Sequence, residues 1–129
     1  MPGEAFEYAV LRVAPRVDRG ELVNAGVVLY CRTLRFLDCR IELDEARRRV
    51  LLALEPTLDL DGVLRHLAVI EQIVRGDPAG GTVATLAAPE RFRWVVSPSS
   101  TMIQPSEVHT GVTTDPAASL EHLFVAQLG

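Results

Sequence analysis

Arg19-Gly20-Glu21-Leu22-Val23-Asn24-Ala25-Gly26-Val27-Val28-Leu29-Tyr30 is a charged turn that runs directly into a β-branched segment. β-Branched and aromatic residues are typical of strands, whereas glycine is typical of turns and of places where two backbones approach closely. Gly20 and Gly26 therefore predict a turn and a close strand contact rather than a phosphate-binding loop. Asn24 places a polar side chain of restricted geometry among residues that form a core.

A first strand precedes this turn, over residues 6–13, which are rich in aromatic and β-branched side chains. Pro15 ends the strand because proline lacks the N–H that a sheet ladder needs. Strand alternation places Ala9, Leu11 and Val13 on one face, and Tyr8, Val10 and Arg12 on the other. The mixed-charge residues 16–21 are then an exposed connection between the first and the second strand.

The second strand is predicted over residues 23–31 and the third over residues 35–42, joined by a short turn at residues 32–34. On the third strand, Leu37, Cys39 and Ile41 alternate with Phe36, Asp38, Arg40 and Glu42. One face is therefore apolar and the other largely polar, which is typical of a sheet covered by helices on a single side.

Helices are predicted next, each marked by a residue that favours a helix start. Asp44 caps a helix that runs to about Leu54, and Asp59 caps a second helix that ends at Gly76. The expected apolar stripes are Val50, Leu51 and Leu54 in the first helix, and Leu60, Val63, Leu64, Leu67, Ile70 and Val74 in the second. The basic run Arg47-Arg48-Arg49 is expected on a solvated face, because consecutive helical positions point in different directions.

The last third of the chain adds a short helix that begins at Pro89, a strand over residues 101–106 and a helix that begins at Asp115-Pro116. Pro105 predicts that this fourth strand lies at a sheet edge or contains a bulge. Leu120, Leu123, Phe124 and Leu128 are the expected inward side chains of the last helix. The chain is predicted to be a single α+β domain over residues 1–129, with the order β-β-β-α-α-α-β-α. Helices pack on a mostly antiparallel sheet of about four strands.

The composition argues against some classes of function. The chain of 129 residues holds 13 arginines and no lysine against 17 acidic residues, which gives a net charge of −4. A negative net charge argues against a general nucleic-acid binder. The charge is uneven, because residues 97–129 contain Glu107, Asp115 and Glu121 but no arginine.

Neither a membrane nor a secreted location is expected. The chain has no run of about 18 apolar residues, which a membrane-spanning helix would need. The first residues, Met1-Pro2-Gly3-Glu4, have neither the basic region nor the apolar core of a signal peptide. We therefore expect a cytoplasmic protein, in which Cys31 and Cys39 are small buried side chains rather than a disulfide.

Catalytic and cofactor motifs are missing from the sequence, so no cofactor is expected and an enzymatic activity is left open. There is no Gly-x-Ser-x-Gly, Cys-x-x-Cys, His-Glu-x-x-His or Gly-x-Gly-x-x-Gly pattern. His66 is expected to be a packed or capping side chain. Glu107 and His109 would share a strand face, with His122 further along the chain, but two members of such a metal site have no predicted position, and no metal is expected.

Polar side chains attached to the sheet are the main candidates for ligand binding: Arg12, Arg19, Glu21, Asn24, Arg40 and Gln104. Arg12 and Asn24 fall near the same end if the first two strands pair. Guanidinium, amide and carboxylate groups there are able to bind an anionic ligand through charge-assisted hydrogen bonds. The structural alternative is that Glu21 pairs with an arginine and Asn24 satisfies the backbone of a tight turn.

A second polar stretch, residues 99–106, is dense in hydroxyl groups and lies beside the predicted edge strand. Its side chains are able to pair with a ligand, with the sheet or with an incoming peptide strand. An ordinary connection from helix to strand is the structural alternative, and the sequence favours it.

Several motifs are shared with one family. Tyr8-x-x-Leu11-Arg12-x-x-Pro15 and Arg19-Gly20-Glu21-x-Val23-Asn24-x-Gly26-Val27 resemble the start of the bacterial domain of unknown function 3037 family. Later pieces are also similar to it: Phe36-Leu37 with Arg40, Ile103-Gln104-Pro105-Ser106, Gly111, Asp115-Pro116 and Leu123-Phe124. No activity, cofactor or catalytic residue is established for this family, so none carries over. The resemblance implies an accessory role, because family members are often encoded beside HipA-like kinases.

Two hypotheses follow from the sequence. The first is a small, non-enzymatic protein that binds a protein partner, for which the resemblance implies a kinase-like one. The second is an enzyme or sensor that binds a phosphate- or carboxylate-bearing small molecule at the six polar residues named above. The sequence leaves the oligomeric state open.

Overall fold

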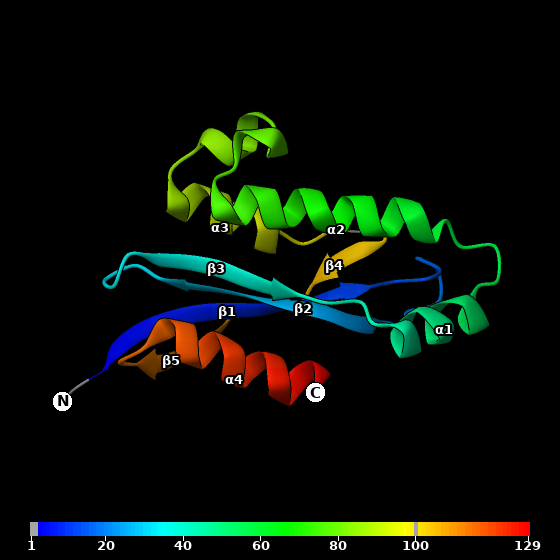
Figure 1. Ribbon diagram of the computed structural model, residues 1–129, viewed down its shortest axis with the longest axis horizontal. Coiled ribbons are helices and arrows are strands. Elements are labelled where there is room, and N and C mark those ends of the chain that lie inside the picture. Colours follow the sequence, from blue (N-terminus) through cyan, green and yellow to red (C-terminus); the bar gives the residue numbers. More distant parts are fainter. Residues whose placement is uncertain (1–2, 100) are drawn as a thin grey trace.

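The computed structural model describes residues 3–99 and 101–129. Its strands are β1 (Glu4–Val13), β2 (Val23–Cys31), β3 (Phe36–Ile41), β4 (Ile103–Pro105) and β5 (His109–Thr113). Its α-helices are α1 (Glu45–Leu54), α2 (Leu60–Arg75), α3 (Ala88–Val96) and α4 (Pro116–Leu128), with the 3-10 helices η1 (Pro78–Gly80) and η2 (Thr82–Thr85) between α2 and α3. The predicted α+β class is confirmed: these residues form an antiparallel sheet with helices packed on it (Figure 1).

The sheet has the order β3-β2-β1-β4, and β5 also pairs with β1. β4 and β5 follow one another along the same edge of β1, from the pair Val13↔Ile103 to the pair Glu4↔Thr113. Between them the main-chain N–H of Ser106 donates to the carbonyl of Val10 at 2.8 Å, and the Val10 N–H donates to the Ser106 hydroxyl at 2.9 Å. A side chain thus replaces a ladder carbonyl at the break. β4 lies at an edge, as Pro105 predicts, whereas β5 is a strand that the sequence did not predict.

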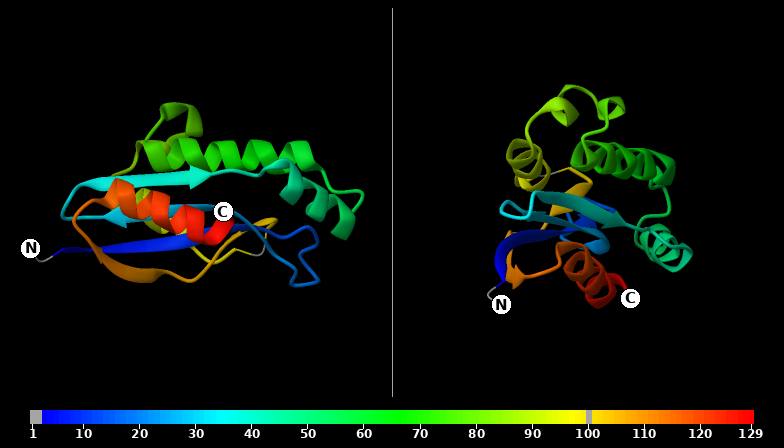
Figure 2. Two further views of the ribbon diagram at one scale, coloured as in Figure 1. Left: turned by 60° about the horizontal axis from the view of Figure 1, so that its bottom comes forward. Right: turned by 60° about the vertical axis from the view of Figure 1, so that its left-hand side comes forward.

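Helices cover both faces of the sheet, so the expectation of a single covered side was wrong (Figure 2). α2 and α3 pack on the face that carries Ala9, Leu11 and Val28, and α4 packs on the face of Val27 and Leu29. The reason lies in β2, where residues 25–31 are buried without alternation. A strand covered on both faces is apolar at every position, whereas the alternating β3 is an edge strand, and its Arg40 pairs with Glu121 of α4.

The capping residues start and end the helices as predicted. Asp44, Asp59 and Asp115 accept hydrogen bonds from the N–H groups of Arg47, Gly62 and Ala118. Gly76 ends α2 in the left-handed conformation, with a φ of 71°. The inward stripes of α2 and α4 are largely as expected, with Val63, Leu67, Ile70 and Val74 buried in α2, and Leu120, Phe124 and Leu128 in α4.

α1 lies beyond the end of the sheet, beside the connection from β3 (Figure 1). Leu51 is fully buried, but Val50 is 48% exposed, so the stripe predicted for this helix was only partly right. The helix is anchored at its start, where Arg48 Nε donates to the carbonyl of Leu43 at 2.7 Å. Across residues 3–99 and 101–129, no helix combines the length and the apolar character needed to cross a membrane.

Two glycines and one arginine have backbone positions that shape the first three strands and the turns between them. Gly20 has a φ of 76°, as a turn glycine does. A Cβ on Gly26 would lie 2.7 Å from the carbonyl oxygen of Arg40, so the close strand approach predicted at Gly26 is confirmed, and the strands concerned are β2 and β3. The β2–β3 turn spans residues 32–35 and ends with Arg35 at a φ of 54°, so β3 begins one residue later than predicted.

Candidate functional site

Arg12, Asn24 and Gln104 are cross-strand neighbours. Arg12 of β1 pairs in register with Asn24 of β2 on one side and with Gln104 of β4 on the other. Directly opposite residues of an antiparallel pair point to the same face. The prediction that Arg12 and Asn24 lie near the same end is therefore confirmed, and Gln104 joins them on the face that α4 covers.

The guanidinium of Arg12 is bound to the main chain of β4. Its Nε donates to the carbonyl of Gln104 at 3.3 Å, and its Nη2 donates to the carbonyl of Pro105 at 3.0 Å. The side-chain amide of Gln104 in turn donates to the carbonyl of Thr101 at 2.9 Å. These donors satisfy carbonyl groups of an irregular edge strand, which is a structural use of the same groups that a ligand would need.

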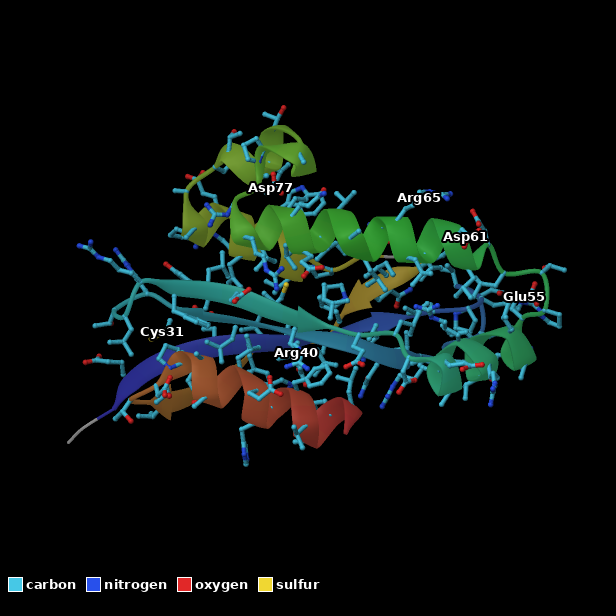
Figure 3. The ribbon with its side chains drawn as sticks, in the orientation of Figure 1. Cys31, Arg40, Glu55, Asp61, Arg65 and Asp77 are labelled. Carbon is cyan, nitrogen blue, oxygen red and sulfur yellow. The ribbon has the colours of Figure 1, made fainter. Side chains whose placement is uncertain are left out.

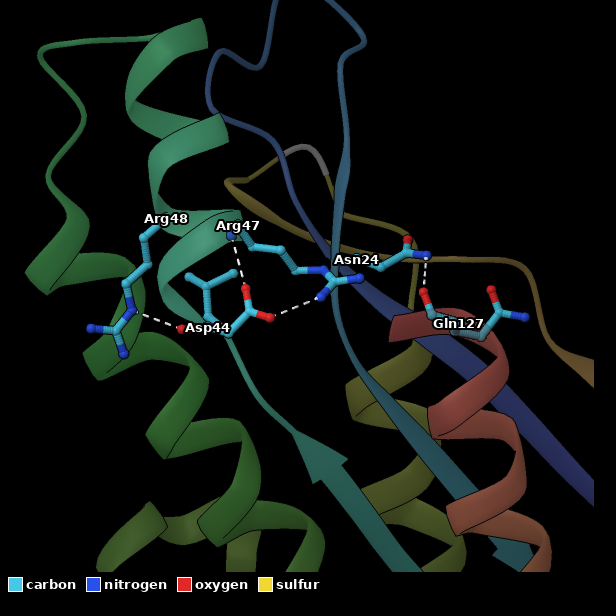
Figure 4. Close-up of polar contacts among 6 residues, drawn as sticks. Asn24, Asp44, Arg47, Arg48 and Gln127 are labelled. Carbon is cyan, nitrogen blue, oxygen red and sulfur yellow. Dashed lines mark hydrogen bonds and ion pairs between the residues drawn. The ribbon is translucent and has the colours of Figure 1, made fainter. Parts of the chain in front are cut away.

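Asn24 binds the end of α4. Its Nδ2 donates to the carbonyl of Gln127 at 3.2 Å, so the amide caps the last turn of the helix (Figure 4). The expected structural alternative, that Asn24 satisfies a tight turn, was wrong. The reason is that α4 folds back across the sheet from more than 100 positions along the chain, and its terminal carbonyls need donors.

Arg47 is a polar residue near this end that the sequence did not single out. Its side chain points from α1 towards β2 (Figure 4), and it pairs with Asp44 at 3.3 Å. It also lines a cavity of about 130 Å³ together with Phe124, Leu128 and Gly129. Only 24% of the side chain is exposed, so Arg47 departs from the solvated face expected for the arginine run. A cation near the carboxyl end of a helix is favourable.

Arg19 and Glu21 pair with each other in the β1–β2 connection, with 2.8 Å between Nε and Oε1. The expected pairing of Glu21 with an arginine is thus confirmed. Arg19 is exposed and Glu21 is half-buried. The pair lies on the loop beyond the strand ends that carry Arg12 and Asn24.

Arg40 lies apart from these residues, on β3, opposite Val27 of β2 (Figure 3). Its guanidinium pairs with Glu121 of α4 and lies over the ring of Phe124, with 4.5 Å between Cζ and the ring centroid. Arg40 therefore holds the sheet edge against α4. It lies on the same face of the sheet as Arg12, but the two arginines contact different residues.

The larger surface cavities lie elsewhere. In the described part of the chain, five cavities range from about 130 to about 420 Å³, and none of these five is lined by the six predicted ligand-binding residues. The binding role of these six residues stays a prediction. What the geometry adds is that each of the six side chains makes at least one hydrogen bond or ion pair within the chain.

The second polar stretch lies beside a groove of about 320 Å³ between α2, α3 and the start of β4. Ser99 and Thr101 hydrogen-bond to each other at 2.7 Å, and Trp94, which is 46% exposed, lines the groove with the half-buried His66. Ser100 lies outside the described residues. Hydroxyl groups that bond to each other and to Ile103 are typical of a connection between helix and strand.

The histidines and carboxylates near β5 are separated. Glu107 lies in the break before β5, His109 packs against Tyr8 with 5.3 Å between ring centroids, and His122 lies on α4. Among residues 3–99 and 101–129, no group of three or more histidine, cysteine, aspartate or glutamate side chains is arranged to hold a metal ion.

Both cysteines are free and buried, as expected, and they lie on opposite faces of the sheet. Burial, helped by the charges of Asp38 and Glu71, raises the pKa of the Cys39 thiol from 9.0 to about 12. The thiol therefore stays protonated at neutral pH, which is the opposite of what a nucleophilic cysteine requires.

An exposed apolar surface lies along β5 and α4. Val112 of β5 is 70% exposed and Val125 of α4 is 56% exposed. Between the two elements lies an open groove of about 420 Å³, lined by Phe6, Val112, Ala118, Ser119, His122 and Leu123. We call this the β5–α4 groove. Sequence reasoning missed it because β5 is short and its residues show no apolar alternation.

The two edges of the sheet differ in charge. The β3 edge carries Asp38, which hydrogen-bonds to Arg75 of α2 at 3.3 Å, and Arg40, which pairs with Glu121. Burial acts to lower the pKa of Arg75, but the hydrogen bond to Asp38 and the charge of Glu71 outweigh it and raise the pKa. β5 contains no aspartate, glutamate, lysine or arginine. Charged side chains protect an edge strand from pairing with another chain, and β5 lacks them.

The fold and the surface define a protein with helices on both faces of an antiparallel sheet, one charged edge and one uncharged edge. The chain belongs to the family described as "Protein of unknown function (DUF3037)", whose model matches residues 8–128. The family resemblance seen in the sequence is therefore confirmed over nearly the whole chain. Searches of curated proteins and of solved structures found no match.

Proposed function

We propose that the chain is a non-enzymatic, single-domain accessory protein of the bacterial cytoplasm that acts by binding a protein partner. The polar groups attached to the sheet support this, because Arg12, Asn24 and Arg40 are occupied by contacts within the chain. A kinase-like partner of the HipA type is the partner class that the family resemblance implies. The net charge of −4 makes nucleic acid a poor candidate.

The observation that carries the proposal is the exposed apolar surface around the β5–α4 groove. Among the residues that the structure describes, Val112 and Val125 are the most exposed large apolar side chains, at 70% and 56%. Val112 lines an open groove together with Phe6, Ala118 and Leu123, so it is not an isolated apolar side chain, whereas Val125 lies on α4 outside the lining of this groove. Exposed apolar side chains that are gathered in one place mark interaction sites more often than scattered ones do.

The test is co-purification of a tagged chain from native cells over a series of salt concentrations. We expect a stoichiometric protein partner that is lost from a Val112→Lys variant. Val50→Lys is the matched control, because Val50 is also exposed (48%) but lies on α1. A chain that emerges alone at every salt concentration would contradict the proposal, and so would binding of candidate kinases that both variants leave unchanged.

A second candidate function is binding of an anionic small molecule beside Arg12. The observation that favours it is that Arg12, Asn24 and Gln104 are direct cross-strand neighbours on one face. A thermal-shift screen against nucleotides and anionic metabolites tests this candidate. A ligand at 100 times its Kd adds about 2.7 kcal/mol to the free energy of unfolding. The candidate fails if no anion raises the midpoint, or if Arg12→Ala leaves the shift intact.

A further inference from the structure

The outer edge of β5 has free main-chain groups, as the hydrogen bonds of β1 indicate. Val10 exchanges hydrogen bonds with Ser106 on the β4 side, and the Ala14 N–H bonds to Met102 on the same side. In an antiparallel strand the main-chain groups of successive residues point to alternate sides. Even-numbered residues of β1 therefore point towards β4 and β5, and odd-numbered residues towards β2.

This alternation determines which N–H and carbonyl groups of β5 point towards β1 and which point away from it. Tyr8, Phe6 and Glu4 of β1 bond to His109, Gly111 and Thr113, which are their register partners. Thr110 and Val112 consequently point their N–H and carbonyl groups away from β1. Within the described residues, neither of the two makes a main-chain hydrogen bond outside the sheet. β5 thus offers a row of main-chain donors and acceptors to another strand.

The surroundings of β5 are acidic. Glu7 is exposed on β1 directly opposite Thr110, Glu107 is exposed just before β5, and Asp115 is exposed just after it. Residues 97–129 contain no arginine. Two copies of this edge, paired with each other, would bring their carboxylates together, which is destabilising. The charge therefore favours a basic strand over a second copy of this chain.

The β5–α4 groove adds an apolar half to the same surface. Phe6 and Leu123 line it and belong to the buried cluster under α4, with Ala118 and His122 at the exposed side. Phe6 and Glu7 lie on opposite faces of the sheet, because side chains alternate along a strand. A strand added to β5 would therefore place every second side chain on the face of the groove and the others on the face that carries Glu7.

We propose that the outer edge of β5 binds an extended segment of a partner protein in which apolar and basic residues alternate. The segment adds a strand to the sheet, so that main-chain hydrogen bonds hold it and the side chains select it. This inference rests on the proposed function, since it names the chemistry of the partner and the mode of binding. The β3 edge, with its ion pairs, is excluded as the docking edge.

The probe is a short synthetic peptide in which valine and arginine alternate, with blocked ends. We expect it to bind the full chain in calorimetry, with an affinity that falls as salt rises. Amide hydrogen exchange then locates the site, and we expect slower exchange at Thr110 and Val112 but not in β3. A peptide that alternates valine and glutamate, and one with proline in its centre, are the controls that should not bind.

Two variants of β5 test the same surface by changing the protein rather than the peptide. Thr110→Pro removes one outward N–H without removing a bond to β1, and Val112→Lys adds a like charge for the basic peptide. We expect each variant to bind the peptide with an affinity lower by about tenfold or more, which is the scale of one lost hydrogen bond or charge contact. Val50→Lys serves as the control, and circular dichroism melts verify that every variant is folded.

The outcomes separate the two proposals. Equal binding of the acidic and basic peptides, or exchange protection outside β5, would overturn the strand-addition mode. A dimer of the chain that Val112→Lys dissociates would also overturn it, because a second copy would then occupy the edge. If a co-purified partner stays bound to both Thr110→Pro and Val112→Lys, this inference fails while the proposed function stands. If the peptide binds as expected but no partner co-purifies, the proposed function fails.

Discussion

The guanidinium of Arg40 lies over the ring of Phe124, 4.5 Å from its centroid. The same guanidinium pairs with Glu121, so one side chain of the β3 edge contacts two residues of α4. Arg40 is partly exposed, which limits the strength of both contacts. The contact nonetheless joins the sheet edge to the helix that covers its second face.

Replacement of Arg40 by alanine should lower the free energy of unfolding by about 1 kcal/mol, the sum expected of an exposed cation–π contact and a surface ion pair. Urea unfolding measures this. Arg32→Ala is the control, because Arg32 is exposed in the β2–β3 turn. An equal effect of the two substitutions would show that Arg40 does not hold α4.

Replacement of Arg12 by lysine should destabilise the chain by about 1–2 kcal/mol. Two nitrogens of the planar guanidinium donate to the carbonyls of Gln104 and Pro105 at the same time. An ammonium group cannot reproduce this two-donor geometry. Urea unfolding of Arg16→Lys, in the exposed loop, is the comparison and should show almost no change. If Arg12→Lys is as stable as the native chain, then Arg12 is free for a ligand and the small-molecule candidate gains support.

Replacement of Asn24 by alanine should cost about 1 kcal/mol, because the amide donates to the carbonyl of Gln127. We also expect faster amide exchange in the last turn of α4, including the N–H of Gly129 that bonds to Val125. Gln127→Ala is the matched control, since it keeps the carbonyl that Asn24 binds. Loss of stability in the control alone would contradict the capping role.

Replacement of Gly26 by alanine should cost about 1–3 kcal/mol, which is typical of overpacking. The new Cβ would stand 2.7 Å from the Arg40 carbonyl oxygen, so β2 and β3 must separate locally. Gly20→Asn should be much milder, because space is open at Gly20 and asparagine tolerates its positive φ. Thermal unfolding of both variants measures the difference, and a Gly26→Ala variant with native stability would rule out the close approach.

The Cys39 thiol should make stability fall at alkaline pH. Its pKa is raised from 9.0 to about 12 in the folded chain, chiefly by burial. The unfolded chain therefore loses this proton first. The thiol's contribution is complete below about pH 9 and is lost as the pH rises towards 12. We expect the gap in urea midpoint between the native chain and Cys39→Ala to narrow between about pH 8 and pH 10. A constant gap would mean that the thiol titrates normally.

Local physics accounts for what the sequence predicted correctly. Asp44, Asp59 and Asp115 cap helices through contacts within three residues, and Gly76 and Gly20 adopt backbone angles that few other residues tolerate. The β1–β2 hairpin follows from strand alternation around a charged turn. Pro105 marks an edge because it has no N–H to donate. These features depend on neighbours in the chain.

Other features depend on residues that are distant in the chain. The second covered face was missed because the alternation of β3 looked like one solvated side, whereas α4 arrives from the far end and packs against Arg40 and Phe36. β5 was missed because His109 to Thr113 has little strand pattern of its own, and its pairing with β1 stabilises it. Val50 and Arg47 differ from their predicted exposure for the same reason, since α1 lies beyond the sheet.

The sequence alone was enough to predict the α+β class, the helix caps, the turn at Gly20 and the family to which the chain belongs. It also placed Arg12 and Asn24 at one end, because register follows from the hairpin. The contacts of those side chains follow from the tertiary structure, since Gln127, Pro105 and Glu121 come from the last quarter of the chain. The tertiary structure also decided that β5, and not β3, is the uncharged edge, because ion pairs between distant elements protect β3.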